Sequence, residues 1–268
     1  MLSSFGITVS TISLLLSLSL LYLSYYDLKL SNNKISKKIY KFAFSQILFT
    51  FLSFITLIIA YVISDFSLIN VYENSHTTKP LFYKISGAWG NHEGSLLLWI
   101  NILVLFSFLF LILNKDKNKY FKLYTIIFQN LLISTFLLFL LTNSNPFSLL
   151  YPIPTEGMGL NPILQDPALA IHPPLLYLGF VGSSIYFSIA LAALITKVDS
   201  KSLALTIKPW VSVSWTFQTL GILVGSIWAY YELGWGGFWF WDPVENSSLM
   251  PWFLMTALLH SVLVLERR

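Results

Sequence analysis

Residues 230–252 read Y-Y-E-L-G-W-G-G-F-W-F-W-D-P-V-E-N-S-S-L-M-P-W, and apolar runs of membrane-spanning length flank this stretch on both sides. It contains four of the nine tryptophans of the chain. Its glycines disfavour a continuous helix and let the backbone approach a flat ligand closely. An aromatic surface between two spans suits a large planar cofactor such as haem. The alternative is an interfacial belt, because Trp and Tyr also gather where a membrane meets water.

The composition of the whole chain is that of an integral membrane protein. Of its 268 residues, 56% are hydrophobic and 10% are charged, and the mean hydropathy is +0.70, whereas soluble domains carry about 25% charged residues. We expect an all-α fold, because helices satisfy their own backbone hydrogen bonds in lipid. Residues 1–268 should form a single transmembrane domain. The absence of cysteine excludes disulfides, thiol catalysis and cysteine metal sites within this chain.

Seven apolar segments approach the ~20 residues that a helix needs to cross a bilayer. They are Gly6–Tyr25, Phe42–Ile63, Ser95–Leu113, Leu123–Leu141, Leu175–Ile195, Val211–Tyr230 and Leu249–Leu265. The pattern therefore predicts a bundle of about seven transmembrane helices in contact with the lipid bilayer.

The basic residues predict the orientation of this bundle. Of the 16 lysines and arginines, 14 follow the first, third, fifth and seventh segments, and only Lys79 and Lys84 lie on the other side. By the positive-inside rule the lysine-rich side faces the cytoplasm or the mitochondrial matrix, so the tryptophan-rich stretch faces the periplasm or the intermembrane space. Both a mitochondrial inner membrane and a bacterial inner membrane fit this charge pattern. Because the basic residues occupy short loops, they indicate topology and no nucleic-acid partner.

Three long connections share the outer side, where we expect the function to lie. They are Asp65–Gly94, Thr142–Pro174 and the tryptophan-rich stretch. The first contains W-G-N-H-E-G-S, in which His92 and Glu93 have the residue types of a proton relay.

His172 lies in the second of these connections and precedes two prolines. A residue before proline favours an extended backbone, and proline favours the first turn of a helix. We therefore expect His172 just above the fifth span, with a restrained backbone. It is either a polar interfacial residue or a ligand.

His260 lies in an apolar segment, about 16 Å along the helix from Leu249, which is near the middle of the ~30 Å hydrocarbon core. An ionisable side chain at that depth is a functional candidate by default. A buried neutral imidazole is a good iron ligand. The alternative is a histidine that hydrogen-bonds to a neighbouring helix.

Asp242 and Glu245 open the last helix, and Pro251 suits its first turn. Acidic residues favour helix N-termini through the helix dipole. The two carboxylates either cap this helix or hydrogen-bond a histidine or groups that contact haem, and the sequence leaves both possibilities open.

Several strings resemble, in the same order, the CcmF family, the haem lyase components of the cytochrome c maturation system. They are W-G-N-H-E-G-S-L-L-L-W (89–99), L-T-N-S-N-P-F (141–147), L-N-P-I-L-Q-D-P (160–167), I-H-P-P-L-L-Y-L-G-F-V-G (171–182) and W-A-Y-Y-E-L-G-W-G-G-F-W-F-W-D-P-V-E-N (228–246). The resemblance covers nearly the whole chain, and its last string is the tryptophan-rich WWD motif of haem-handling proteins.

The resemblance implies two haem sites. His172 would be one of two outer histidines that ligate the haem to be attached to apocytochrome c, and His260 would be one of two ligands of an intramembrane haem b. The platform for the first haem would consist of Trp235, Gly236, Gly237, Trp239, Trp241 and Asp242. The function implied is that of a haem-binding subunit of a haem lyase. The alternatives are a haem transporter that hands haem on and, less favoured because the spans hold few acids or lysines, a structural subunit of a respiratory complex.

Two departures from the family pattern matter. Phe238 stands where the family usually has another tryptophan. The chain also ends at Arg268, before the helices that carry the partner histidines in the full-length family. The resemblance therefore implies the N-terminal part of a split, mitochondrial CcmF. Its partners would be the remaining C-terminal part on another chain, other cytochrome c maturation subunits and apocytochrome c.

Overall fold

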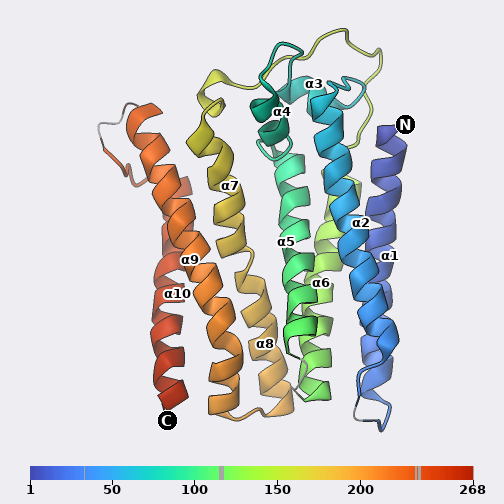
Figure 1. The fold of residues 1–268 in the computed structure, drawn as a ribbon, viewed down its shortest axis with the longest axis vertical. Coiled ribbons are helices and arrows are strands. Elements are labelled where there is room, and N and C mark those ends of the chain that lie inside the picture. The colour runs from blue at the N-terminus through green and yellow to red at the C-terminus, as the bar shows by residue number, and fades with distance from the viewer. Residues whose placement is uncertain (33, 115–117, 233, 235–236, 268) are drawn as a thin grey trace.

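The chain folds into a bundle of long helices that run side by side, as the computed structural model shows (Figure 1). The structure describes residues 1–32, 34–114, 118–232, 234 and 237–267. Among these residues it has no strand. The elements are α1 (Leu2–Leu28), α2 (Lys37–Val62), α3 (Ile69–Asn74), α4 (Leu81–Gly87), α5 (His92–Leu113), α6 (Lys119–Asn143), the 3-10 turn η1 (Pro162–Leu164), α7 (Pro167–Phe180), α8 (Ser183–Thr196), α9 (Ser200–Glu232) and α10 (Pro243–Arg267).

Seven of the described segments are long and apolar enough to cross a membrane: α1, α2, α5, α6, α7 together with α8, α9, and α10. The predicted all-α membrane protein with about seven spans is therefore confirmed. The fifth, sixth and seventh spans begin clearly earlier than predicted, at Pro167 in place of Leu175, at Ser200 in place of Val211 and at Pro243 in place of Leu249. Capping and backbone hydrogen bonds decide where a helix starts, and hydropathy does not report either of them.

The connections divide between the two ends of the bundle (Figure 1). One end, which we call the cap end, carries α3, α4 and residues 144–166, and the described part of the tryptophan-rich stretch lies at the same end. Backbone hydrogen bonds join the connections of the cap end to one another: Leu150 N donates to Ser67 O at 2.9 Å, and Met158 N donates to Tyr72 O at 2.8 Å. The connections that follow α1, α5 and α8, and the end of α10, lie at the opposite, lysine-rich end. The three long connections therefore share one end, as the lysine count indicates.

Paired polar side chains hold α1 against α2 and α6. Ser10 and Ser53 hydroxyls lie 2.6 Å apart, and Ser17 Oγ donates to Asn130 O at 3.1 Å. These residues are buried. Lipid tails are as apolar as leucine, so packing of small residues and interhelical hydrogen bonds drive association inside a membrane. The first four spans therefore form a scaffold whose buried polar groups largely satisfy one another.

The fifth span is interrupted between α7 and α8, at Val181 and Gly182. A Cβ atom at Gly182 would lie 2.6 Å from Ser214 Oγ of α9. Glycine at this position therefore permits the close approach of the two spans, which continues along α7 toward the cap end.

Candidate functional site

His172 lies inside α7 and does not sit above the span in an extended backbone, so that prediction was wrong. The reason is that α7 begins before the two prolines. Pro167 occupies the first turn, and Asp166 Oδ1 accepts a hydrogen bond from Leu169 N at 3.0 Å as the N-cap. The conformational preference of a residue before proline is local, and here the established helix overrides it.

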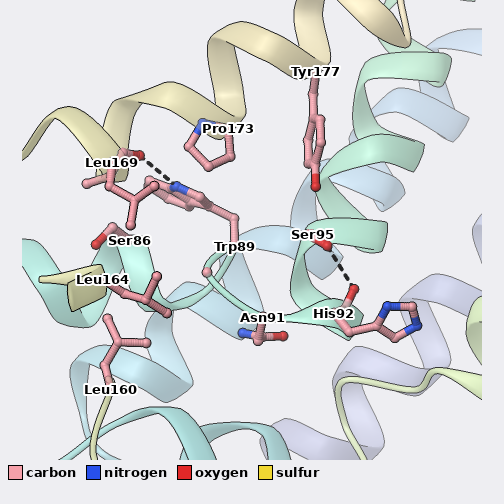
Figure 2. A pocket seen from close by; sticks show the side chains of 12 residues that line it. Ser86, Trp89, Asn91, His92, Ser95, Leu160, Leu164, Leu169, Pro173 and Tyr177 are labelled. Carbon is pink, nitrogen blue, oxygen red and sulfur yellow. Dashed lines mark hydrogen bonds between the residues drawn. The ribbon is translucent and has the colours of Figure 1, made fainter. Parts of the chain in front are cut away.

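The helix continues through Pro173 and Pro174 with help from a distant tryptophan. Pro174 has no N–H, so the carbonyl of Ala170 lacks its usual donor four residues on. Trp89 Nε1 donates to Ala170 O at 2.9 Å and supplies the missing hydrogen bond (Figure 2). Trp89 belongs to the W-G-N-H-E-G-S string, and α7 carries the I-H-P-P string. A residue of the first motif therefore supports the helix that contains the second.

The imidazole of His172 is fixed by α9. Its Nδ1 lies 2.7 Å from the carbonyl oxygen of Gly221, which can only accept, so Nδ1 carries the proton. Nε2 is then left with a lone pair, which is the form of histidine that binds metals. Gly225 faces the flat side of the ring, since a Cβ atom there would lie 2.6 Å from His172 Cε1.

A cavity of about 290 Å³ opens beside this ring, between α7, α9 and the start of α10. It is lined by His172, Leu176, Ile222, Gly225, Ser226, Trp228, Ala229, Trp239, Asp242, Val244, Glu245 and Ser248. We call it the His172 cavity. The fold thus brings His172 together with part of the tryptophan-rich stretch, although the two are far apart in the sequence.

Two indole groups of this cavity stand out because they lack partners. Trp228 Nε1 and Trp239 Nε1 are buried, and neither donates a hydrogen bond to any group that the structure describes. A buried polar group left unpaired costs about 1–3 kcal/mol. Both indoles belong to side chains that line the cavity with His172, so a ligand with hydrogen-bond acceptors is one candidate partner for them.

The other predicted platform residues divide into three groups. Asp242 lines the His172 cavity with Trp239, while Gly237 and Trp241 do not, and Trp241 is 70% exposed. Trp235 and Gly236 lie outside the described residues. Phe238, the departure from the family pattern, stacks on Tyr230 with ring centroids 4.4 Å apart. This aromatic pair stiffens the tryptophan-rich stretch next to α9.

Asp242 and Glu245 do cap the last helix. Asp242 Oδ1 accepts from Glu245 N at 2.6 Å, and Glu245 Oε2 accepts from the backbone N–H groups of Phe240 and Trp241 at 2.7 and 2.8 Å. Trp241 adopts a φ of +65°, a left-handed conformation that these bonds help to hold. Pro251 lies in the helix interior, not in the first turn as predicted, because Pro243 is already the first residue of α10.

His260 is exposed on the surface of α10, which is a candidate membrane span, so the described part of this chain does not itself enclose the imidazole. α10 packs mainly on α9, and the side of the helix that carries His260 faces away from the bundle core. Its Nδ1 lies 2.8 Å from Thr256 O of its own helix, so no neighbouring helix holds it in the described structure. Since the Thr256 carbonyl can only accept, Nδ1 carries the proton and Nε2 keeps its lone pair.

A second cavity, of about 360 Å³, lies on another side of α7 at the cap end. Trp89, Leu169, Pro173 and Tyr177 point into it, whereas the ring of His92 turns away (Figure 2). His92 Nε2 lies 3.1 Å from Ser144 Oγ. Glu93 Oε2 instead accepts from Asn70 Nδ2 at 3.0 Å. The two residues of the predicted relay therefore contact different partners.

The lysines of the cap end are already engaged. Lys79 Nζ is buried and donates to Asn74 O at 3.1 Å, and Lys84 Nζ donates to Ser64 Oγ at 2.8 Å. Burial, with help from the nearby charge of Lys84, lowers the pKa of Lys79 to about 8. Neither lysine lines the His172 cavity, whose charged lining residues are Asp242 and Glu245.

Comparison with known proteins identifies the family. A family profile described as "Cytochrome C assembly protein" matches residues 89–268, which include the His172 cavity and all of α5 to α10. The chain belongs to this family. It is of the CcmF/CycK type. It is 55% identical to the cytochrome c-type biogenesis protein CycK of Bradyrhizobium diazoefficiens, over 84% of this chain and 34% of that protein.

Further relatives agree with this assignment. CcmF of Escherichia coli is 47% identical over 81% of this chain and 34% of that protein. A solved structure described as "Cytochrome c Heme Lyase CcmF" superposes with a TM-score of 0.82 at 30% identity, covering 100% of this chain and 42% of that one. The chain spans about a third of the length of the curated relatives it matches. It is a multi-pass membrane protein of a cytochrome c biogenesis family.

Sequence reasoning missed two parts of the CcmF-type site. One is Trp89, whose role depends on a contact 81 residues away and had no local signal. The other is the string G-I-L-V-G at residues 221–225, which packs against α7. Here a signal existed, because two glycines four residues apart are a known pattern for close helix packing in membranes.

Proposed function

We propose that this chain is a haem-binding subunit of a cytochrome c maturation complex and that it positions haem for covalent attachment to apocytochrome c. The observation that carries the proposal is the His172 cavity. It joins a histidine with a free Nε2 to two buried tryptophan N–H donors that have no partner among the described residues. The similarity to a solved haem lyase supports it further.

The residues of this cavity fit haem. An imidazole whose Nδ1–H is held by a backbone carbonyl has a fixed ring orientation and a more basic Nε2, as metal ligands usually do. The indole N–H groups of Trp228 and Trp239 can donate to the carboxylates of such a cofactor. Gly225 leaves the ring space to lie flat against α9. Trp235, Gly236, Gly237 and Trp241 complete the proposed platform.

When bound, haem supplies the iron and the vinyl groups that react with the two thiols of an apocytochrome C-x-x-C-H segment. The role of this chain is to bind and orient. His172 would ligate the iron, and the tryptophans that line the cavity would pack against the cofactor and exclude water. Holding reactants in a productive geometry accounts for much of what such a site can contribute.

The carboxylates of haem need a partner chain, because desolvated carboxylates require charge-assisted donors. The charged residues that line the His172 cavity are both acids, and each is occupied with backbone N–H groups of the helix start. An unpaired buried carboxylate costs several kcal/mol. We therefore expect arginine or lysine from another subunit beside this cavity.

His260 is the proposed ligand of a second, intramembrane haem b. Its exposed position leaves room for a partner that would cover α10 and supply a second ligand. This requirement fits a chain that spans about a third of the length of its curated relatives. The remaining part of a CcmF-type protein, on the same or another chain, is the proposed partner, and the membrane is a mitochondrial or bacterial inner membrane with the cap end facing outward.

The test is the haem-dependent maturation of a cytochrome c by the assembled complex. His172→Ala should abolish holocytochrome formation and leave the intramembrane b-type absorbance intact. His92→Ala is the matched control, because it removes another imidazole from the cap end and should leave maturation unchanged. Maturation by the His172→Ala complex at the normal rate would refute the proposal. Normal haem binding and release without attachment, in the complete wild-type system, would indicate a haem transporter instead.

A further inference from the structure

We propose that Gly221 and Gly225 of α9 are positioning residues for His172, which fix both the place of its ring and the ring nitrogen that it presents. The inference rests on the proposed function only in treating His172 as a haem ligand. The geometry of the ring itself can be measured without haem.

The two glycines act through different atoms. Gly221 supplies the carbonyl oxygen that accepts from His172 Nδ1 at 2.7 Å. Gly225 supplies empty space, since a Cβ atom there would lie 2.6 Å from Cε1 and 2.7 Å from Nδ1 of the ring. Real Cβ atoms do not approach so closely, and the ring cannot retreat while its Nδ1–H keeps the bond to Gly221. The spacing of four residues places both groups on one face of α9.

The same glycines bring the helix backbones together. A Cβ atom at Gly221 would lie 2.8 Å from the backbone of Leu176, one turn after His172 on α7. Without this close approach the Gly221 carbonyl would lie too far away to hold the ring. The carbonyl holds Nδ1–H, so Nε2 is the ring nitrogen left to bind a ligand in the cavity that His172 lines.

Gly179 provides a matched comparison. It belongs to α7, and a Cβ atom there would lie 2.4 Å from the backbone N of Gln218, so Gly179→Ala also disturbs the α7–α9 contact. It does not touch the ring of His172. A purely structural role would make Gly179→Ala and Gly225→Ala equivalent, whereas a positioning role predicts that only Gly225→Ala changes the state of the imidazole.

The first measurement is the nitrogen-15 NMR spectrum of the full chain labelled at histidine, in lipid nanodiscs and without haem. The His172 signal is assigned by its loss in His172→Ala. We expect the wild type and Gly179→Ala to show the tautomer protonated at Nδ1. Gly225→Ala should shift the signal to the other tautomer or to a mixture. An unchanged tautomer in Gly225→Ala would overturn the inference.

The second measurement remains informative even if Gly225→Ala folds poorly. The melting temperature of Gly225→Ala is compared with that of the double variant Gly225→Ala with His172→Ala. The clash disappears with the ring, so the loss caused by the alanine should be largely restored in the double variant. The loss caused by Gly179→Ala should be the same in both backgrounds. Equal losses for Gly225→Ala in both backgrounds would also overturn the inference.

The haem affinity of the assembled complex then separates the inference from the proposed function. Changes to groups that orient a metal-bound histidine lower affinity about 10- to 100-fold. We expect such a decrease in Gly225→Ala, together with an altered absorbance of the haem held at the cap end. If the tautomer and melting data hold but His172→Ala does not affect haem binding, then the glycines position the ring and the proposed function fails.

Discussion

His172 and His260 hold their rings alike but lie in opposite surroundings. In both, Nδ1 donates to a backbone carbonyl, at 2.7 Å to Gly221 and at 2.8 Å to Thr256, so Nε2 is the free nitrogen. For His172 the carbonyl belongs to another helix, and the free nitrogen lies beside a lined cavity. For His260 the carbonyl belongs to its own helix, and the side chain is exposed.

The difference shows how much of each site one chain can build. The ring of His172 is held by a neighbouring helix and is therefore positioned by tertiary structure. Residues of α7, of α9 and of the region around the start of α10 already line its cavity. A ring held by its own helix has an orientation but no enclosure. An imidazole that faced hydrocarbon without a partner would be costly. The chain therefore provides most of the site at His172 and only one side of a site at His260.

The largest expected effect tests this asymmetry directly. In the isolated chain, His172→Ala should lower the bound haem at least about tenfold, since it removes the iron ligand, and His260→Ala should leave haem content unchanged. In the complex with the partner, His260→Ala should remove the b-type absorbance of the intramembrane haem. The measurements are haem content and absorbance spectra of purified proteins. Two six-coordinate haems in the isolated chain would contradict the comparison.

A smaller effect is expected at Trp89. Trp89→Phe keeps an aromatic but smaller ring and removes the N–H that serves Ala170 O, and the loss of this donor should cost about 1–3 kcal/mol. The loss should weaken haem binding at His172 and spare the b-type spectrum. Trp210→Phe, a buried ring that packs against Phe106 and Phe110, is the control for the loss of an indole elsewhere. If Trp89→Phe weakened the binding of both haems equally, Trp89 would not act specifically on the His172 site.

At Asp242 the cap and the charge can be separated. Asp242→Ala should destabilise the start of α10 by about 1 kcal/mol, whereas Asp242→Asn should be nearly neutral because asparagine caps equally well. The readout is hydrogen exchange of the backbone amides of residues 244–248. A large loss of haem affinity in Asp242→Asn with normal exchange would show that the carboxylate acts on the cofactor in addition to the helix.

The smallest effect on stability is expected at Thr256, one helical turn before His260. Thr256 Oγ1 accepts from Trp215 Nε1 at 2.8 Å, while the carbonyl of Thr256 holds the imidazole. Thr256→Val removes only the hydroxyl, so it should cost about 0.6 kcal/mol, an average value for hydrogen bonds between helices in membranes. The b-type spectrum should not change. A double-mutant cycle with Trp215→Phe measures the pair, and a spectral shift would show that α9 helps to orient His260.

The sequence predicted the features that depend on composition and spacing. Hydropathy located seven spans, and the lysine distribution placed the three long connections at one end. It also indicated that His172 and the tryptophan-rich stretch share that end. The failures have two causes, which are local helix capping and tertiary contact. The prolines after His172 suggested an extended backbone, but Asp166 starts the helix earlier and Trp89 replaces a lost donor.

The exposure of His260 could not be predicted from this sequence. The apolar residues around it are suited equally to a bundle core, to lipid and to a partner helix. Only the packing of α10 on α9 shows which side of the helix remains uncovered. The glycines at 221 and 225 could have been read as a helix-packing motif, but nothing in the sequence showed that their partner would be an imidazole.

The paired hydroxyls of α1 have a consequence for the order in which the helices assemble. Ser10 meets Ser53 of α2, which is made 43 residues after it, but Ser17 meets Asn130 of α6, which is made 113 residues after Ser17. At a synthesis rate of about 5–20 residues per second, the wait of Ser17 lasts roughly 6–23 s. During that time one side of α1 carries a polar group without its final neighbour. The first helix therefore remains near the insertion machinery, or exposes a hydroxyl to lipid, until the fourth span arrives.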